Sequence, residues 1–143
     1  MNTTESRTTI YTAQSKYYFF ARMIICKYVL ERGYVPLNPF NLWGYFLYDL
    51  VDRDLVRRAN NNIIRIVDEM WVFGPIADGV LAEIKLAMSQ GKPILYFSVG
   101  SSIDQIHPID VHEIEFEEKA VGDDNESVLR ETLANYSPPS TKS

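Results

Sequence analysis

The segment DEMWVFGPIADGVLAE at residues 68–83 decides the fold of this chain. Residues 69–73 form a short apolar run, the pattern of a parallel strand that is buried on both faces. Gly74-Pro75 then marks a turn, and apolar residues recur at helical spacing over residues 77–90. An open α/β sheet binds its ligands beyond the carboxyl ends of its strands. The layout therefore places the carboxylate of Glu83 close to a candidate site.

The same alternation of strand and helix continues on both sides of this segment. Strands are expected at residues 9–12, 34–37, 69–73, 93–98 and 111–116, and helices at residues 16–32, 52–65, 77–90 and 125–135. This order implies parallel βαβ units with right-handed crossovers. We predict an α/β three-layer sandwich of the flavodoxin or Rossmann kind, with four or five mainly parallel strands.

Three of the predicted helices have apolar residues on one face, and some helix ends carry capping signals. Gly33 and Gly91 suit the ends of two helices, while Ser15 and Asp78 suit helix starts. The predicted buried faces are Phe19, Met23, Cys26 and Leu30 on the first helix; Leu55, Val56, Ala59, Ile63 and Ile66 on the second; and Val80, Leu81, Ile84, Ala87 and Met88 on the third.

Length and composition indicate one globular domain, which we place at residues 9–136 between polar, disordered ends at 1–8 and 137–143. The chain has 143 residues, 46% of them hydrophobic, and a net charge of −5. The acidic balance argues against a nucleic-acid partner, which needs a basic patch. One cysteine, no apolar span of membrane length and no signal-peptide core favour a cytoplasmic protein without a membrane partner.

Glu83 is the first candidate for chemistry. At about 100° per residue, it lies at the edge of the buried face of its helix and away from the solvent side. Burial there would raise its pKa, and the start of the helix would lower it. Two interpretations stay open: Glu83 acts on a ligand, or it only favours the helix dipole.

Other candidates lie at the predicted strand ends and in the aromatic segment 38–48. The turn from Tyr11 through Thr12, Gln14 and Ser15 can bind phosphate or ribose oxygens at a helix start, although it lacks a dinucleotide fingerprint. Asn38 and Phe40 begin the aromatic segment, which can stack on a base, fill the core or form a dimer surface. Two histidines without metal-ligand spacing suggest no metal site, and we expect no cofactor.

The chain resembles the nucleoside 2-deoxyribosyltransferase-like superfamily, which includes 2′-deoxynucleoside 5′-phosphate N-hydrolases. The resemblance covers residues 9–100 and is carried by residues 67–74, by DGVLAE at 78–83 and by GKPI at 91–94. Residues 10–13 and 33–36 are similar to the first two strands of that superfamily.

The resemblance implies that Glu83 is the nucleophile at the anomeric carbon and that Gly79 lines the sugar site. It implies that residues 12–15 face the substrate and that Asn60 stands where the superfamily has a helper aspartate. Asparagine cannot donate a proton as an acid, and the first loop lacks the Gly/Arg-rich pattern of the phosphate hydrolases. Asp78 is then a candidate second acid, by its proximity in the sequence. The resemblance also implies a homodimer or higher homo-oligomer.

Two functional hypotheses follow. In the first, the protein cleaves an N-glycosidic bond or transfers a 2-deoxyribosyl group, with a nucleoside or nucleotide as its small-molecule partner. Positive charge builds on the sugar during this reaction, and a carboxylate can stabilise it or trap it covalently. In the second, the same fold holds a nucleotide without turnover, as a regulatory module. Fold alone cannot decide between them.

Overall fold

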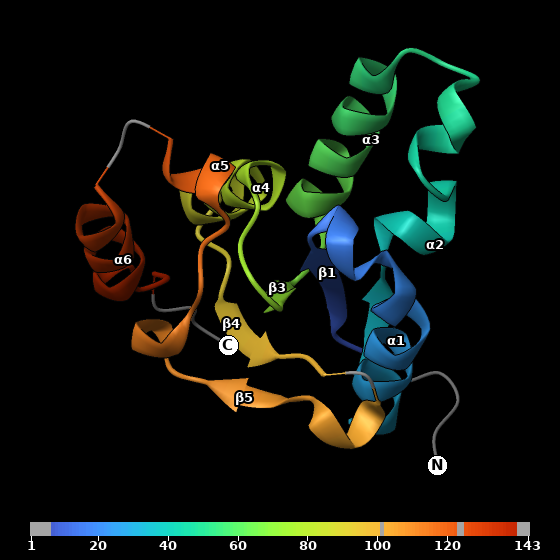
Figure 1. The fold of residues 1–143 in the computed structure, drawn as a ribbon. Helices are drawn as coiled ribbons and strands as arrows, with labels where there is room; N and C mark the ends of the chain where they lie inside the picture. The colour runs from blue at the N-terminus through green and yellow to red at the C-terminus, as the bar shows by residue number, and fades with distance from the viewer. Residues whose placement is uncertain (1–6, 101, 123–124, 140–143) are drawn as a thin grey trace.

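The computed structural model describes residues 7–100, 102–122 and 125–139. A five-stranded sheet in the order β2-β1-β3-β4-β5 forms its centre (Figure 1). This is the strand order of flavodoxin-like doubly wound folds. The predicted α/β three-layer fold with mainly parallel strands is therefore confirmed.

The strands are short; four of them run parallel, and the antiparallel β5 forms one edge of the sheet. β1 pairs in parallel with β2 and β3, β3 pairs in parallel with β4, and β4 pairs antiparallel with β5. Their bounds are β1 Thr9–Gln14, β2 Val35–Leu37, β3 Glu69–Phe73, β4 Ile94–Ser98 and β5 His107–Ile109.

Helices and 3₁₀ turns connect the strands. The main helices are α1 Arg22–Glu31, α2 Pro39–Trp43, α3 Arg53–Ile66, α4 Asp78–Ser89, α5 Glu118–Val121 and α6 Glu126–Asn135. The 3₁₀ turns are η1 Lys16–Ala21, η2 Phe46–Asp49, η3 Ile103–Gln105 and η4 Val111–Glu113. In Figure 1, α3 and the segment before it project away from the sheet at the upper right.

Two hydrophobic cores cover the two faces of the sheet. On one face, Ile10, Trp71 and Phe73 pack with Ile25 and Val29 of α1. The other core packs strand residues against α3, α4 and α6; among its buried members are Tyr11, Ala13, Ile64, Met70, Val72, Val80, Ile84 and Leu133. The alternation of side chains along β1 and β3 supplies both cores, as expected of strands buried on both faces.

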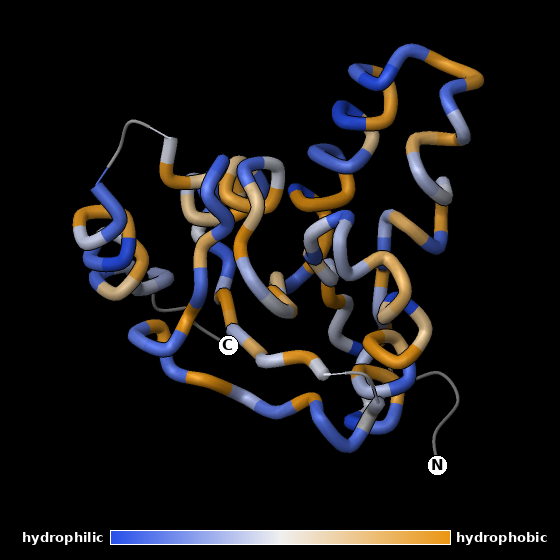
Figure 2. Tube along the Cα trace, viewed as in Figure 1, coloured by the Kyte–Doolittle hydropathy of each residue, from blue (hydrophilic) through white to orange (hydrophobic). Residues whose placement is uncertain are grey.

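The predicted buried face of α4 is largely confirmed, that of α3 is correct only in part, and that of α1 is wrong. Val80, Leu81, Ile84 and Ala87 are buried. On α1, Met23 and Leu30 are 64% and 59% exposed, and Ile25, Tyr28 and Val29 are buried instead. On α3, Val56 is buried and Ile63 is partly buried against the core as predicted, whereas Leu55 and Ile66 are 55% and 69% exposed and Ile64 is buried instead. Figure 2 shows the alternation of hydrophilic and hydrophobic residues along α3.

Several predicted boundaries also need correction. The strand expected at residues 111–116 is wrong, because this stretch contains η4 and a single bridge between Ile76 and Phe116. The fifth strand is instead β5, whose three residues include Pro108 and are too few for an alternating pattern to be recognised. The N-cap of α4 is Ala77, and Asp78 is the first helical residue. Ser15 does cap a helix start, that of η1.

The predicted disordered ends fall largely outside the described residues, which exclude 1–6 and 140–143. Residues 7–8 and 137–139 are described, and they belong to no helix or strand. Among the helices that the structure describes, none is long and apolar enough to cross a membrane.

Candidate functional site

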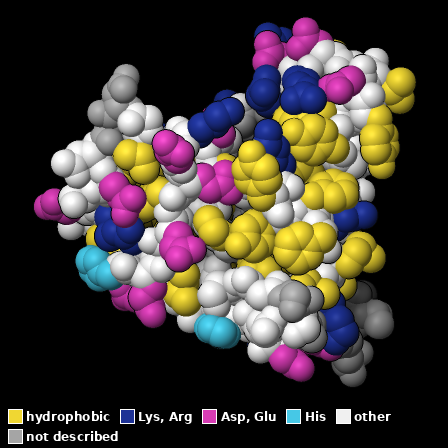
Figure 3. All heavy atoms as spheres, in the orientation of Figure 1, with side chains coloured by type: hydrophobic (Ala, Val, Ile, Leu, Met, Phe, Trp, Pro, Cys, Tyr) yellow, Lys and Arg dark blue, Asp and Glu magenta, His cyan; other side chains and the backbone are white. Residues whose placement is uncertain are grey.

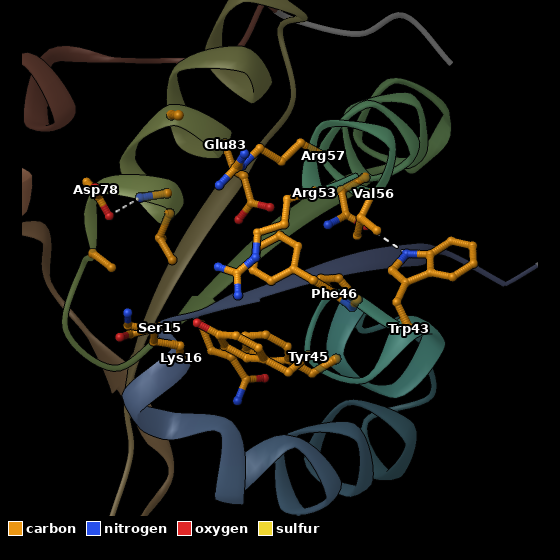
Figure 4. A pocket seen from close by; sticks show the side chains of 18 of the residues that line it. Ser15, Lys16, Trp43, Tyr45, Phe46, Arg53, Val56, Arg57, Asp78 and Glu83 are labelled. Carbon is orange, nitrogen blue, oxygen red and sulfur yellow. Dashed lines mark hydrogen bonds between the residues drawn. The ribbon is translucent and has the colours of Figure 1, made fainter. Parts of the chain in front are cut away.

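A pocket of about 490 Å³ opens at the carboxyl ends of β1 and β3. In a 2-1-3-4-5 sheet this is the point where the strand order reverses, and ligands of doubly wound folds bind there. Its walls come from the turn after β1, from α2 and η2, from α3, and from the start of α4 (Figure 4). The pocket is therefore assembled from segments that are far apart in the sequence.

Glu83 and Tyr11 form a hydrogen-bonded pair at this pocket. Tyr11 on β1 is fully buried, and its hydroxyl donates a hydrogen bond of 2.5 Å to a carboxylate oxygen of Glu83 on α4. Glu83 itself is only partly buried and lines the pocket. The tyrosine thus orients the carboxylate from the core side, and the pocket gives a ligand access to it.

Burial changes the protonation of both members of the pair. It raises the pKa of the Glu83 carboxyl from 4.5 to about 7, against the opposing effect of the hydrogen bond from Tyr11. Burial, followed by the nearby Glu83 carboxylate, raises the pKa of Tyr11 well above its ordinary value. Near neutral pH, Glu83 therefore exchanges between carboxylate and carboxylic acid, while Tyr11 remains a hydrogen-bond donor. Strong pKa shifts of this kind are typical of functional sites, although structural networks also produce them.

A buried polar network supports the turn after β1. The side-chain amide of Asn38 donates to the Thr12 hydroxyl at 2.8 Å and to Gln14 Oε1 at 2.6 Å. Gln14 in turn donates to the backbone carbonyl of Tyr18 at 2.6 Å. Every buried side-chain polar atom of the described residues has a hydrogen-bond partner. The network therefore fixes the turn after β1, which lines the pocket at Gln14 and Ser15.

Aromatic side chains form one wall of the pocket. Phe40 and Tyr45 stack with an interplanar angle of 11° and a centroid distance of 6.4 Å. Phe46 packs edge-on against Tyr45. Trp43 Nε1 donates a hydrogen bond of 2.9 Å to Oδ1 of Asn60 on α3, which links α2 to α3. Such a wall suits a flat, conjugated ligand.

Basic side chains form the rim. Arg53 and Arg57 reach from α3 into the pocket on the side where Glu83 lies (Figure 4). Arg53 is ion-paired with Asp49 at 2.9 Å, and its guanidinium lies 4.7 Å from the ring centroid of Phe46. Lys16 and Lys119 also line the pocket.

Asp78 lies at the pocket without a direct tie to Glu83. Its carboxylate accepts a hydrogen bond of 2.8 Å from the backbone N–H of Gly79, at the start of α4. A Cβ at Gly79 would meet no atom within 4 Å, so packing does not require glycine there and the space is open to a ligand. Among the described residues, no group of three His, Cys, Asp or Glu side chains could hold a metal ion.

Most of the predicted site residues come together at this pocket. Those that line it are Gln14, Ser15, Phe40, Asn60, Asp78, Gly79 and Glu83. Tyr11 reaches the site through its hydroxyl, and Thr12 and Asn38 lie behind it in the buried network.

Sequence reasoning missed the basic and acidic rim residues Lys16, Arg53, Arg57, Glu117 and Lys119. The two arginines stand one helical turn apart, on the same face of α3 as the pocket residues Val56 and Asn60. Their spacing in the sequence shows that they share a helix face, but it does not show that this face meets the pocket.

The fold and the pocket define an α/β protein of flavodoxin-like strand order, with a partly buried carboxylate at its ligand-binding edge. A comparison with protein families matches residues 11–97 to the family described as "Domain of unknown function (DUF7768)", and the chain belongs to this family. No curated protein matches the chain.

This family assignment corrects the resemblance drawn from the sequence. The matched family carries a different name from the nucleoside 2-deoxyribosyltransferase-like superfamily, and no named relative supports that superfamily. The short patterns that carried the resemblance mark a strand, a turn and a helix start, which many α/β proteins share. Any function must therefore be argued from the pocket itself.

Proposed function

We propose that the protein cleaves or transfers the glycosyl group of a nucleoside or nucleotide, with Glu83 as the nucleophile. The observation that carries this proposal is the Tyr11–Glu83 pair at the wall of a 490 Å³ pocket. A carboxylate with one oxygen held by a buried hydroxyl presents its other oxygen in a fixed direction. That orientation is what attack on a sugar carbon requires.

The proposed reaction has two steps. A Glu83 oxygen bonds to the anomeric carbon as the carbon–nitrogen bond breaks, and the bonding electrons leave with the base. The departing nitrogen takes a proton from water or from an acid at the pocket, for which Asp78 is the candidate. Water or a second base then attacks the anomeric carbon and gives up a proton to Asp78 or to solvent; the bond to Glu83 breaks and its electrons return to the carboxylate, which gives hydrolysis or transfer.

The walls of the pocket suit the two parts of such a substrate. Phe40, Tyr45 and Phe46 offer faces and edges for a base. Gln14 and Asn60 line the pocket, and in this proposal their amide groups face the sugar. Hydrophobic walls with a few polar groups are typical of small-molecule sites.

A base-release assay tests this proposal. The protein is incubated with a panel of nucleosides and nucleotides, and free base is measured by chromatography. We expect release with the wild type, and a rate at least about 100-fold lower with Glu83→Ala. Gln90→Ala, which alters an exposed residue just beyond α4 and outside the pocket, is the control and should release base at the wild-type rate. Equal rates for wild type and Glu83→Ala would contradict the proposal.

A binding module without turnover is the second candidate function. The raised pKa of Glu83 favours it, because a carboxyl that is neutral for about half the time near pH 7 can donate a hydrogen bond to a ligand. Thermal-shift measurements over the same panel test this alternative by mass action. A nucleotide that stabilises the protein and is recovered intact would support binding without chemistry.

We also propose that the protein acts in the cytoplasm as a homo-oligomer. Its single cysteine suits a reducing compartment. Tyr48 and Leu50, at the projecting tip before α3, are 78% and 81% exposed and offer apolar surface to a second copy. Light scattering tests the oligomer, and a monomeric mass at high concentration would contradict it.

A further inference from the structure

The pocket carries more positive charge at its rim than the acidic chain as a whole would suggest. The chain has 19 acidic against 14 basic residues. The basic residues lining the pocket nevertheless number four, Lys16, Arg53, Arg57 and Lys119, against three acids, of which Glu83 lies at the Tyr11 pair. Figure 3 shows Lys and Arg side chains gathered over α3, beside a hydrophobic area.

We propose that Arg53 and Arg57 form a phosphate subsite at the rim of the Glu83 pocket, so that the preferred substrate is a nucleoside monophosphate. This inference rests on the proposed function and extends it to the far end of the substrate. The two arginines stand one helical turn apart, a spacing at which their side chains are neighbours. Both reach from α3 toward the side of the pocket where Glu83 lies (Figure 4).

Stacking prepares the two guanidinium groups for an anion. Arg53 lies 5.2 Å from the ring centroid of Tyr45 and 4.7 Å from that of Phe46, and Arg57 lies 5.4 Å from that of Phe46. An aromatic contact occupies a face of the guanidinium and leaves its in-plane N–H groups able to donate. Those N–H groups match phosphate oxygens in pairs.

The present ion pairs of the two arginines do not prevent phosphate binding. Arg53 pairs with Asp49 and Arg57 with Asp54, and both pairs are exposed, with side-chain exposures between 41% and 67%. Exposed pairs of this kind contribute little to stability. A phosphate dianion that meets both arginines at once competes well with two separate carboxylates, because it concentrates more charge on one group.

The aromatic wall distinguishes a nucleotide from a simple anion. Phe46 contacts both arginines, and it also belongs to the wall formed by Tyr45 and Phe40. A ligand with a phosphate at the arginines and a base on the aromatic wall would span the space in front of Glu83. Inorganic phosphate could make only the first of these contacts.

Calorimetric binding tests the subsite without interference from turnover. The full chain with Glu83→Gln is titrated with each 2′-deoxynucleoside, with its 5′-monophosphate and with inorganic phosphate. We expect at least one monophosphate to bind about tenfold or more tightly than both its nucleoside and inorganic phosphate. In the Glu83→Gln chain, Arg53→Gln and Arg57→Gln together should remove the tighter binding of the monophosphate over its nucleoside. Arg57→Gln alone should reduce it.

The matched control is Arg58→Gln, an exposed arginine of the same helix that does not line the pocket. It should keep the full advantage of the monophosphate. Equal affinity for nucleosides and monophosphates, an advantage that survives in the double arginine variant, or no binding at all would overturn the subsite. If nucleosides bind as tightly as monophosphates and still release base, the proposed reaction stands and only the phosphate subsite is wrong. If a monophosphate binds tightly but releases no base, the phosphate subsite stands and the proposed reaction is wrong.

Discussion

The hydroxyl of Tyr11 and the carboxylate of Glu83 meet although they are 72 residues apart in the sequence. One residue is fully buried on a central strand, and the other is partly buried at a pocket. Placing an ionisable carboxyl there costs desolvation energy, since its charged form prefers water. The raised pKa of Glu83 measures that cost.

The stability of the protein should therefore fall with rising pH because of Glu83. The folded state holds its proton up to a pKa of about 7, whereas the unfolded chain releases it near 4.5. The contribution of this proton to the free energy of unfolding is therefore complete below pH 4.5 and is lost as the pH rises through 7. Glu83→Gln, which stays neutral, should match wild type near pH 4.5 and exceed it by up to about 3 kcal/mol at pH 8.

Urea unfolding at several pH values measures this difference in the free energy of unfolding. Gln90→Ala, which alters an exposed side chain that does not titrate, is the control and should show no such trend. A difference between Glu83→Gln and wild type that is constant from pH 4.5 to 8 would count against the raised pKa.

Removing the Tyr11 hydroxyl should raise the pKa of Glu83 further. The hydrogen bond from Tyr11 lowers that pKa, so Tyr11→Phe leaves only the effect of burial. Carbon NMR of labelled glutamate should show the Glu83 carboxyl titrating at a higher pH in the variant. Tyr96→Phe, on strand β4, which β3 separates from β1, should leave the titration unchanged. An unchanged or lower pKa in Tyr11→Phe would show that the hydroxyl does not stabilise the carboxylate.

At the scale of elements, the turn η2 has an unfavourable backbone. Phe46, Leu47, Tyr48 and Asp49 all have positive φ, between 52° and 62°. This region costs a residue with a side chain about 1–2 kcal/mol. Arg53 offsets part of that cost, through its ion pair with Asp49 and its contacts with Tyr45 and Phe46. The pocket wall thus depends on a strained turn that one arginine holds.

Glycine at Tyr48 should relieve this strain. The side chain is 78% exposed, so little packing is lost. We expect Tyr48→Gly to raise the free energy of unfolding by about 0.5–1 kcal/mol. Leu50→Gly is the matched control, because Leu50 is 81% exposed but has a φ of −71°, and it should destabilise. Denaturant unfolding distinguishes the two, and equal destabilisation by both changes would argue against strain.

Asn38 should be far more important for stability than its neighbour Asn41. It caps α2 by accepting from the N–H groups of Phe40 and Asn41, and it donates to Thr12 and Gln14. Asn38→Ala should lower the free energy of unfolding by about 2–4 kcal/mol. The exposed Asn41→Ala should change it by less than about 0.5 kcal/mol. A similar small loss for both variants in thermal unfolding would contradict this role.

The sequence predicted β3 and α4 well, but it misplaced the buried face of α1 and part of that of α3. On α1, two sets of apolar residues recur at helical spacing: Met23, Cys26 and Leu30 form one, and Ile25, Tyr28 and Val29 form the other. Periodicity alone could not choose between these two faces, and the structure buries the second. In α3, the polar Asn60 lies between the buried Val56 and Ile64 on the same face, and Val56 and Asn60 line the pocket. A search for purely apolar faces passes over such a face.

At the scale of the whole molecule, the candidate site is a product of topology. The sequence could place Glu83, Gly79 and Ser15 at strand ends, because strand–turn–helix order is a local pattern. It could not bring Arg53, Arg57 and Phe46 to the same pocket, because their position depends on how α3 and the projecting segment before it pack. The Tyr11–Glu83 contact is also long-range, and no local pattern predicts it.

The most direct test of the central claim is to trap the sugar on Glu83. The protein is incubated with a panel of 2′-fluoro nucleosides and nucleotides, whose electron-withdrawing fluorine slows release of a glycosyl-enzyme, and is then analysed by intact and peptide mass spectrometry. We predict a mass increase equal to the glycosyl group, located on Glu83 and absent from Glu83→Gln. Base release from these compounds without any adduct, or an adduct on another residue, would contradict Glu83 as the nucleophile.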